Sequence, residues 1–201
     1  MRGHLVRQQW EPDPSLRAPR KHLRPCSYDA FVPDPIAGLE ISISGEVAAL
    51  VSSAEAAVAS LNATAQPSLN PLARLLLRTE SIASSKVDGM QLDVHRLARA
   101  EATHDAGRAI GREAAEVLAN IDAMQFAMEL SVESATLEAQ DLLAIHEVLL
   151  ERAPGGGDPG HFRNEQNWIG GNDYNPCGAD FVPPPPHEVE GLIEDLCIFC
   201  D

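Results

Sequence analysis

Aromatic residues are scarce in this chain: two Trp, two Tyr and five Phe make up about 4% of its 201 residues. Hydrophobic residues nevertheless reach 44%, which is enough for a packed core and excludes wholesale disorder. Abundant alanine and leucine with few aromatics favour helices that pack through small side chains over a β-sandwich. We therefore expect an all-α fold, with one β-hairpin that is described below.

Basic residues are also few, with 15 Lys and Arg against 30 Asp and Glu, for a net charge of -15. This balance excludes sequence-independent nucleic-acid binding, which requires Lys and Arg to neutralise phosphates. Residues 1–24 are the exception, because they carry six basic and two acidic side chains. We expect this basic stretch to be a disordered tail.

No run approaches the roughly 20 apolar residues of a membrane helix, and no apolar segment follows the N-terminus. We therefore expect a cytoplasmic protein that does not bind membranes. Four cysteines do not make a disulfide framework in a chain of this length. Cys197 and Cys200 have only Cys177 and His187 as plausible companions, which does not give the two paired sets of ligands typical of a zinc site, so we expect buried thiols and no metal ligands.

Proline and hydrophobic periodicity divide the chain into three parts. Residues 1–38 form a leader and an extended segment, because prolines at 12, 14, 19, 25, 33 and 35 forbid a long helix. Residues 39–158 form a helical region, and residues 159–201 add a hairpin and a last helix that starts at Pro186. Apolar residues recur at helical spacing in the region's first two helices. The predicted buried faces are Val47, Leu50, Val51, Ala54, Val58 and Leu61, then Leu72, Leu75, Leu76, Thr79, Ile82 and Ala83.

Further helices are predicted over 92–101, 112–129 and 136–152. Between the last of these and Pro186, two short apolar runs, Trp168-Ile169 and Phe181-Val182, enclose a segment rich in Gly, Asn, Asp and Pro. That pattern is typical of a β-hairpin, and the four prolines 183–186 end its second strand. We call residues 163–186 the flap and expect it to project from the helices.

Four stretches of the chain resemble the N-terminal part of Fic-domain proteins, in the group whose inhibitory helix precedes the Fic core. They are LLRTESIASSKVDGM (76–90), EVLANIDAM (116–124), PGHFRNEQNWIGG (159–171) and ADFVPPPPHEVEGLIEDL (179–196). The resemblance implies a helical fold with one β-hairpin flap. It also implies transfer of AMP from ATP, with Mg²⁺, to a hydroxyl of a target protein. The oligomeric state is open, with a homo-oligomer among the options.

The family's catalytic loop, HPFxDGNGR, has no counterpart in this sequence, because none of the seven histidines is followed by Pro-Phe. We therefore expect a chain truncated before its catalytic loop and inactive alone, and we assign no catalytic residue. Two alternatives remain. The chain is a non-enzymatic binding module that docks through its flap, or a helical structural domain.

The resemblance implies that Ser84, Asp88 and Gly89 are the motif residues near the C-terminus of an inhibitory helix, and that this helix reaches into the ATP site. Ser84 and Asp88 are four residues apart and therefore share one helical face. Asp88 stands where the family has Glu, and its shorter side chain predicts weaker autoinhibition. The alternative is a solvated polar face before a glycine at the helix C-terminus.

The resemblance also implies that the flap's backbone edge pairs with a target segment. The candidate residues are Trp168, Ile169, Gly170, Gly171, Asn172, Ala179, Phe181 and Val182. Glycine backbone permits close approach of another chain, so Gly170 and Gly171 are the strongest candidates. The aromatic and aliphatic side chains could instead be core anchors. Arg163 could contact a nucleotide or carboxylate, although a structural ion pair is favoured.

Overall fold

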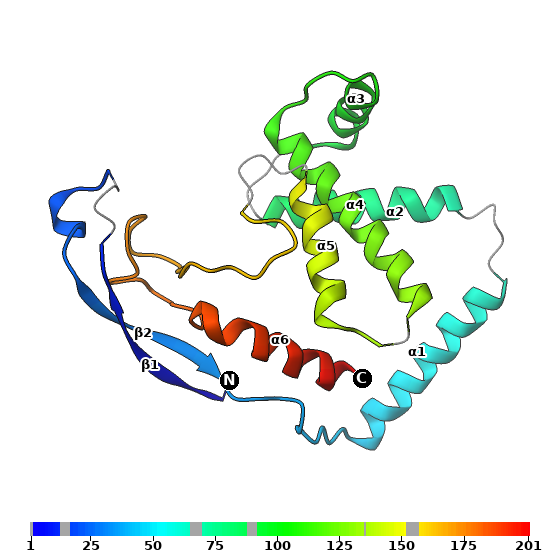
Figure 1. Cartoon of the computed structure of the whole chain (residues 1–201). Coiled ribbons are helices and arrows are strands. Elements are labelled where there is room, and N and C mark those ends of the chain that lie inside the picture. Colours follow the sequence, from blue (N-terminus) through cyan, green and yellow to red (C-terminus); the bar gives the residue numbers. More distant parts are fainter. Residues whose placement is uncertain (1, 13–16, 65–69, 88–91, 135, 152–156) are drawn as a thin grey trace. The chain divides into compact units, whose positions relative to one another are not determined.

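The structure is a computed structural model that describes the chain except residues 1, 13–16, 65–69, 88–91, 135 and 152–156 (Figure 1). Its elements are β1 (Gly3–Trp10), η1 (Arg20–His22), β2 (Cys26–Pro33), α1 (Gly45–Thr64), α2 (Asn70–Val87), α3 (Val94–Asp105), α4 (Arg112–Glu133), α5 (Ala139–Glu151) and α6 (Pro186–Cys200). They fall into two compact units. Unit 1 is Met1–Leu39, Ser134–Ala144 and Gly160–Asp201, and unit 2 is Glu40–Glu133 and Ile145–Pro159.

The described residues form a mostly helical fold with one two-stranded antiparallel sheet, as predicted. The sheet lies in the leader, however, where β1 pairs with β2 in a register that runs from Gly3 opposite Pro33 to Trp10 opposite Cys26. The prediction of a disordered tail was therefore wrong for residues 3–10. Proline forbids a long helix, but two eight-residue strands fit between the prolines, which lie in the connection and at the end of β2.

Most predicted helices are present, and their starts follow the sequence signals. Pro186 occupies the first turn of α6, where its missing N–H requires no partner. The Asp93 carboxylate caps α3 by accepting a 2.9 Å hydrogen bond from the Arg96 N–H. This bond favours the charged carboxylate and lowers the Asp93 pKa. Helices α4 and α5 begin at Arg112 and Ala139, close to their predicted starts at 112 and 136.

The core of unit 2 lies where α2, α3 and α4 meet. Its buried residues are Ile82, Leu92, Leu97, Ala114, Val117, Leu118 and Ile121. Between the helices, the Ser81 hydroxyl lies 3.3 Å from the Met124 sulfur, and Arg78 forms an ion pair with Glu101. This core consists of aliphatic and alanine side chains, in keeping with the scarcity of aromatics.

The predicted buried face of α2 is only partly correct. Ile82 is buried, but Leu72, Leu75 and Leu76 are each at least half exposed, and Thr79 and Ala83 are exposed. The side chains that face the core are Leu77, Ser81 and Ile82. They occupy neighbouring helical positions, so the buried stripe is rotated from the predicted one. Periodicity indicates an apolar stripe but does not say which part of it meets a neighbour.

Helix α1 has no buried residue, so its predicted face, 47 to 61, is exposed throughout. With 20 residues and a mean hydropathy of 1.3, it is also long and apolar enough to cross a membrane, contrary to the expectation that no run approaches this length. The core helices of soluble proteins pass the same test. The absence of membrane binding therefore stays a prediction.

Leu97 offers a test of the core of unit 2. It is 2% exposed, and Leu97→Ala would leave a cavity among α2, α3 and α4 that lowers the free energy of unfolding by about 2–5 kcal/mol. Leu76→Ala is the matched control, because Leu76 is 61% exposed on α2 and its removal should change that free energy by less than about 0.5 kcal/mol. Urea denaturation followed by circular dichroism measures both. Equal losses would contradict this assignment of the core.

Candidate functional site

The flap is built around one backbone bridge in unit 1. Ile169 N–H donates to Phe181 O at 2.9 Å, and Phe181 N–H returns a bond to Ile169 O at 3.2 Å. Asp180 N–H also donates to Ile169 O at 2.8 Å. The predicted strands therefore meet, but only as an isolated bridge between Ile169 and Phe181. The glycine- and proline-rich sequence on both sides does not extend the ladder.

Two consecutive glycines follow the bridge and turn the chain. Gly170 and Gly171 have φ angles of 76° and 75°, which disfavour any other residue. A Cβ on Gly171 would lie 2.8 Å from the backbone oxygen of Gly178, and one on Gly170 would collide with the Asp180 carboxylate. The close approach seen at these glycines is within the flap itself, and the predicted approach of another chain stays a prediction.

Asn172 and Asn175 organise the tip of the flap. The side-chain oxygen of Asn172, Oδ1, accepts hydrogen bonds from the backbone N–H groups of Tyr174 and Asn175 at 2.9 and 3.1 Å. Its amide nitrogen donates to Asn175 Oδ1 at 3.1 Å, and that oxygen also accepts from Cys177 N–H at 3.1 Å. Asn175 is 3% exposed. The Asn172 side chain therefore holds the turn together, and its proposed docking role stays a prediction.

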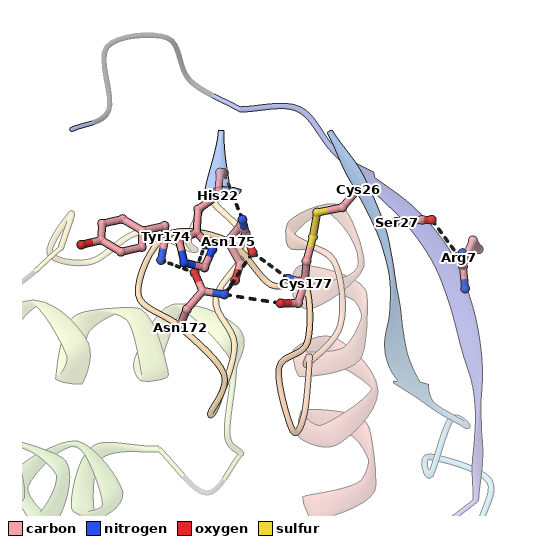
Figure 2. Close-up of a disulfide and its surroundings, with 8 residues drawn as sticks. All are labelled: Arg7, His22, Cys26, Ser27, Asn172, Tyr174, Asn175 and Cys177. Carbon is pink, nitrogen blue, oxygen red and sulfur yellow. Dashed lines mark hydrogen bonds between the residues drawn. A yellow bond between two sulfur atoms is a disulfide. The ribbon is translucent and has the colours of Figure 1, made fainter. Parts of the chain in front are cut away.

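The N-terminal hairpin, defined here as β1, β2 and their connection, holds the tip from outside (Figure 2). Asn175 Nδ2 donates to His22 O at 3.1 Å, and the His22 ring stacks on Tyr174 with centroids 5.2 Å apart. A disulfide joins Cys26 at the start of β2 to Cys177 in the flap. Three kinds of contact therefore attach the connection and β2 to residues 174–177.

Aromatic pairs continue this attachment along the flap. Trp10 and Trp168 meet edge to face with centroids 5.7 Å apart, and Phe31 and Phe181 lie 6.2 Å apart. Phe31 N–H donates to Val182 O at 2.9 Å. Edge-to-face aromatic pairs add to the free energy of burial, by about 0.5–1.5 kcal/mol each.

These bonds determine which edge of the flap is open. The segment 180–182 lies between Ile169 on one side and Phe31 of β2 on the other. Because Ile169 uses both of its backbone groups toward Phe181, the backbone of Trp168 points to the opposite edge. At Val182 this edge is therefore bonded to the chain's own hairpin, whereas no backbone hydrogen bond among the described residues joins Trp168 to a neighbouring segment.

A small hollow separates β2 from the flap between the points where they are joined. It has a volume of about 250 Å³, and its lining includes Tyr28, Asp29, Pro176, Asp180 and Phe181. The disulfide lies toward one end of the two segments and the Phe31–Val182 bond toward the other. The flap strand is therefore fixed to β2 at two points and is open between them.

Arg163 and Gln166 bind the carbonyls of the proline run. Arg163 donates from Nη1 to Glu165 O at 2.9 Å and from Nη2 to Pro184 O. Gln166 Nε2 donates to Pro183 O at 3.1 Å. Burial lowers the pKa of Arg163 and raises that of Tyr28, and the attraction between the two groups opposes both shifts. Within the described part of the chain, Arg163 therefore donates to backbone carbonyls, where an ion pair with a carboxylate was favoured.

The predicted side-chain anchors of the flap divide into two kinds. Trp168 packs against Trp10 and donates from Nε1 to Asn172 O at 2.6 Å, and Val182 is 5% exposed. Ile169 and Phe181 are 64% and 43% exposed. The anchor interpretation therefore fits Trp168 and Val182, while Ile169 and Phe181 are accessible to a partner.

The predicted inhibitory residues belong to another part of the molecule. Ser84 is exposed on α2, in unit 2, whereas the flap residues belong to unit 1. Asp88 and Gly89 lie outside the described residues. The inhibitory role of these three positions stays a prediction.

The cysteines differ from the expectation of buried thiols. Cys26 and Cys177 form a disulfide, Cys200 is an exposed thiol, and Cys197 alone is a buried one. Spacing could not reveal the pair, because its members are 151 residues apart and are brought together by packing of the hairpin on the flap. Within the described ranges, no group of three or more His, Cys, Asp or Glu residues could hold a metal.

Alanine substitutions at Gly171 and Gly178 distinguish the effect of backbone strain from that of steric crowding. Both have positive φ, but a Cβ on Gly178 meets nothing within 4 Å, whereas one on Gly171 meets backbone atoms. Gly178→Ala should destabilise the flap by about 1–2 kcal/mol through strain alone, and Gly171→Ala by clearly more. Faster amide hydrogen exchange at Ile169 and Phe181 measures the effect. Equal exchange in the two variants would contradict the close approach at Gly171.

Asn175 tests the tip. Asn175→Ala leaves the His22 carbonyl and the Cys177 N–H without their side-chain partner, which should reduce stability by about 1–3 kcal/mol. Asn164→Ala is the control, because Asn164 is exposed and should be neutral within about 0.5 kcal/mol. Thermal unfolding measures both changes. If Asn175→Ala left the unfolding temperature unchanged, the hydrogen bonds of the tip would not stabilise the flap.

Comparison with known families identifies part of unit 2. Residues 48–129 match the family model described as Fic/DOC family N-terminal, a range that begins within α1 and continues into α4. No curated protein matched the chain. The matched range contains Ser84 and two of the four stretches that carried the resemblance in the sequence. Over this range the chain is similar to the N-terminal region of Fic/DOC proteins, which supports the resemblance to Fic-domain proteins.

Proposed function

We infer that this chain is the target-docking and regulatory part of a Fic-type protein that transfers AMP from ATP to a hydroxyl of another protein. The observation that carries this proposal is the backbone edge at Trp168, together with the match of residues 48–129 to the Fic/DOC family model. The flap presents the target segment, and Ser84, Asp88 and Gly89 are the inhibitory residues.

Strand addition explains how the flap would bind a target. An extended segment can pair with the outward backbone groups of Trp168, because the inner side of Ile169 is already bonded to Phe181. Gly170 and Gly171 have no side chain to keep the segment away. Ile169 is 64% exposed and offers an apolar contact beside that edge. Backbone pairing sets the position of the target, and side-chain contacts add selectivity.

The phosphate chemistry belongs to residues other than those described. Magnesium and ATP phosphates are held by carboxylates and backbone amides, and the described ranges contain no candidate metal cluster. The 201 residues also contain no HPFxDGNGR run. We therefore assign no step of transfer to this chain's residues and expect no transfer by the polypeptide alone.

The inhibitory part of the proposal concerns the C-terminal end of α2. Ser84 is exposed there, and Asp88 follows four residues later. A carboxylate at that position would pair with an arginine of the catalytic loop and exclude the γ-phosphate from its productive position. Aspartate is one methylene shorter than glutamate, so the pairing should be weaker and inhibition incomplete.

One observation favours a second candidate, a non-enzymatic docking module. Helix α1 exposes an apolar stripe that includes Leu50, Val58 and Leu61, at 70%, 57% and 62% exposure. Such a stripe is typical of a helix that packs on another protein surface.

A labelling experiment tests the transfer. A protein in which this chain is joined to a Fic catalytic core is incubated with a cell extract and ATP labelled at the α-phosphate, and label above that of the extract alone is compared with the same measurement for γ-labelled ATP, the control for phosphorylation. We expect label on target proteins from α-labelled ATP only, and none from the 201-residue chain alone. Asp88→Glu should lower the labelling rate because the longer side chain pairs better. Labelling from γ-labelled ATP only would contradict AMP transfer.

Ile169 tests the docking edge in the same assay. Ile169→Ala should lower target labelling by about tenfold, which corresponds to loss of about 1.4 kcal/mol of apolar contact. Ile198→Ala is the matched control, because Ile198 on α6 is also 64% exposed. Equal labelling by the two variants would show that Ile169 of the flap does not contribute to target binding.

A further inference from the structure

The Cys26–Cys177 disulfide joins two segments that lie far apart in the sequence. Its Cα atoms are 6.4 Å apart, within the range that a disulfide spans. Cys26 starts β2, and Cys177 lies in the flap directly after the turn of Asn172 and Asn175. Both cysteines are only partly buried. The bond therefore lies where its chemical state can affect the flap.

The hairpin is attached to the flap differently at its two ends. The Phe31 end has buried apolar residues, Ala30 and Val32, with Val182 of the flap and the Phe31–Val182 backbone bond. At the Cys26 end, no residue of Cys26–Asp29 is buried. That end has the disulfide, the hydrogen bond from Asn175 to His22, and aromatic contacts. The apolar end can persist without the disulfide, whereas the Cys26 end depends on it.

We propose that Cys26–Cys177 is a redox-controlled strap: oxidised, it fixes the tip of the flap against the N-terminal hairpin, and reduced, it releases the tip while the Phe31 end stays attached. Residues 172–178 are the part set free. Their own turn has only Asn175 and Pro176 buried, and Asn175 loses its neighbour when His22 moves away.

The reaction is thiol–disulfide exchange with a dithiol. A thiolate of the dithiol attacks one sulfur of the protein disulfide, which breaks the S–S bond and forms a mixed disulfide. The released cysteine takes up a proton. The second thiol of the dithiol then loses its proton and attacks the mixed disulfide. The products are two protein thiols and one oxidised, cyclic dithiol, so two electrons and two protons move to the protein.

The consequence for targets rests on the proposed function of the flap. The backbone edge at Trp168 leads into the strapped tip, so a loose tip would present that edge less rigidly. Ordering it on binding would then reduce affinity. An oxidising environment would favour docking and a reducing one would oppose it. The strap itself can be tested without target or nucleotide, so the two proposals can fail separately.

The chain carries a built-in reporter for this strap. Its two tryptophans, Trp10 and Trp168, form the edge-to-face pair between hairpin and flap. Trp10 stands opposite Cys26 in the β1–β2 register. Paired tryptophans in this geometry give an exciton couplet in the far-ultraviolet circular dichroism. The couplet should be present in the oxidised chain and lost on reduction.

The experiment compares the 201-residue chain before and after treatment with dithiothreitol. We expect two reactive thiols per denatured chain in the oxidised form and four in the reduced form. Amide exchange of residues 172–178 should become about tenfold faster or more on reduction, while Ala30 and Val32 keep their protection. Cys26→Ser with Cys177→Ser should reproduce the reduced state without dithiothreitol. Cys200→Ser, which removes an exposed free thiol, should leave the redox response intact.

Three results would overturn the proposal. Four reactive thiols in the oxidised chain would show that the disulfide does not form. An unchanged tryptophan couplet and unchanged exchange after reduction would show that the strap does not control the tip. Loss of protection at Ala30 and Val32 as well would show that the bond holds the whole hairpin rather than its Cys26 end. Trp10→Phe should abolish the couplet of the oxidised chain, which confirms its source.

Discussion

The attachment of the N-terminal hairpin to the flap is the interaction on which unit 1 depends. The flap has one backbone bridge, two turn-forming glycines and few buried apolar residues, so it cannot bury a core alone. The hairpin supplies a second strand edge through Phe31, a covalent link through Cys26 and aromatic partners. A two-stranded hairpin is itself marginal in water. Each element is therefore stabilised by the other.

The scarce aromatic residues are concentrated in this attachment. Both tryptophans pair with each other there, and so do Phe31 and Phe181. Unit 2 instead packs aliphatic and alanine side chains between helices. Low aromatic content thus reflects a helical core that does not need such residues and a loop-rich unit that does. Large rings provide contact area where regular secondary structure is lacking.

Local signals in the sequence predicted the helices and the turn-forming glycines, because caps, prolines and positive-φ positions act within a few residues. Pairings across the chain were not predictable. Cys26 meets Cys177 only because β2 lies along the flap, and composition cannot indicate that contact. The buried side of α2 was misplaced because periodicity gives a stripe without its partner. The Fic/DOC resemblance succeeded because motifs record such long-range constraints together.

The attachment of the N-terminal hairpin to the flap also limits where a partner can bind. Asp180 and Phe181 are bonded to Ile169, and Val182 is bonded to Phe31, so less of the backbone of 180–182 is left for a partner, and its docking role stays a prediction. The residues that follow Ile169 lead to the tip held by Asn175 and Cys177. A target that paired with the flap at Trp168 would therefore contact a surface whose order depends on the N-terminal hairpin. Under the proposed function, target binding and the attachment of the flap to the N-terminal hairpin therefore involve the same short segment of chain.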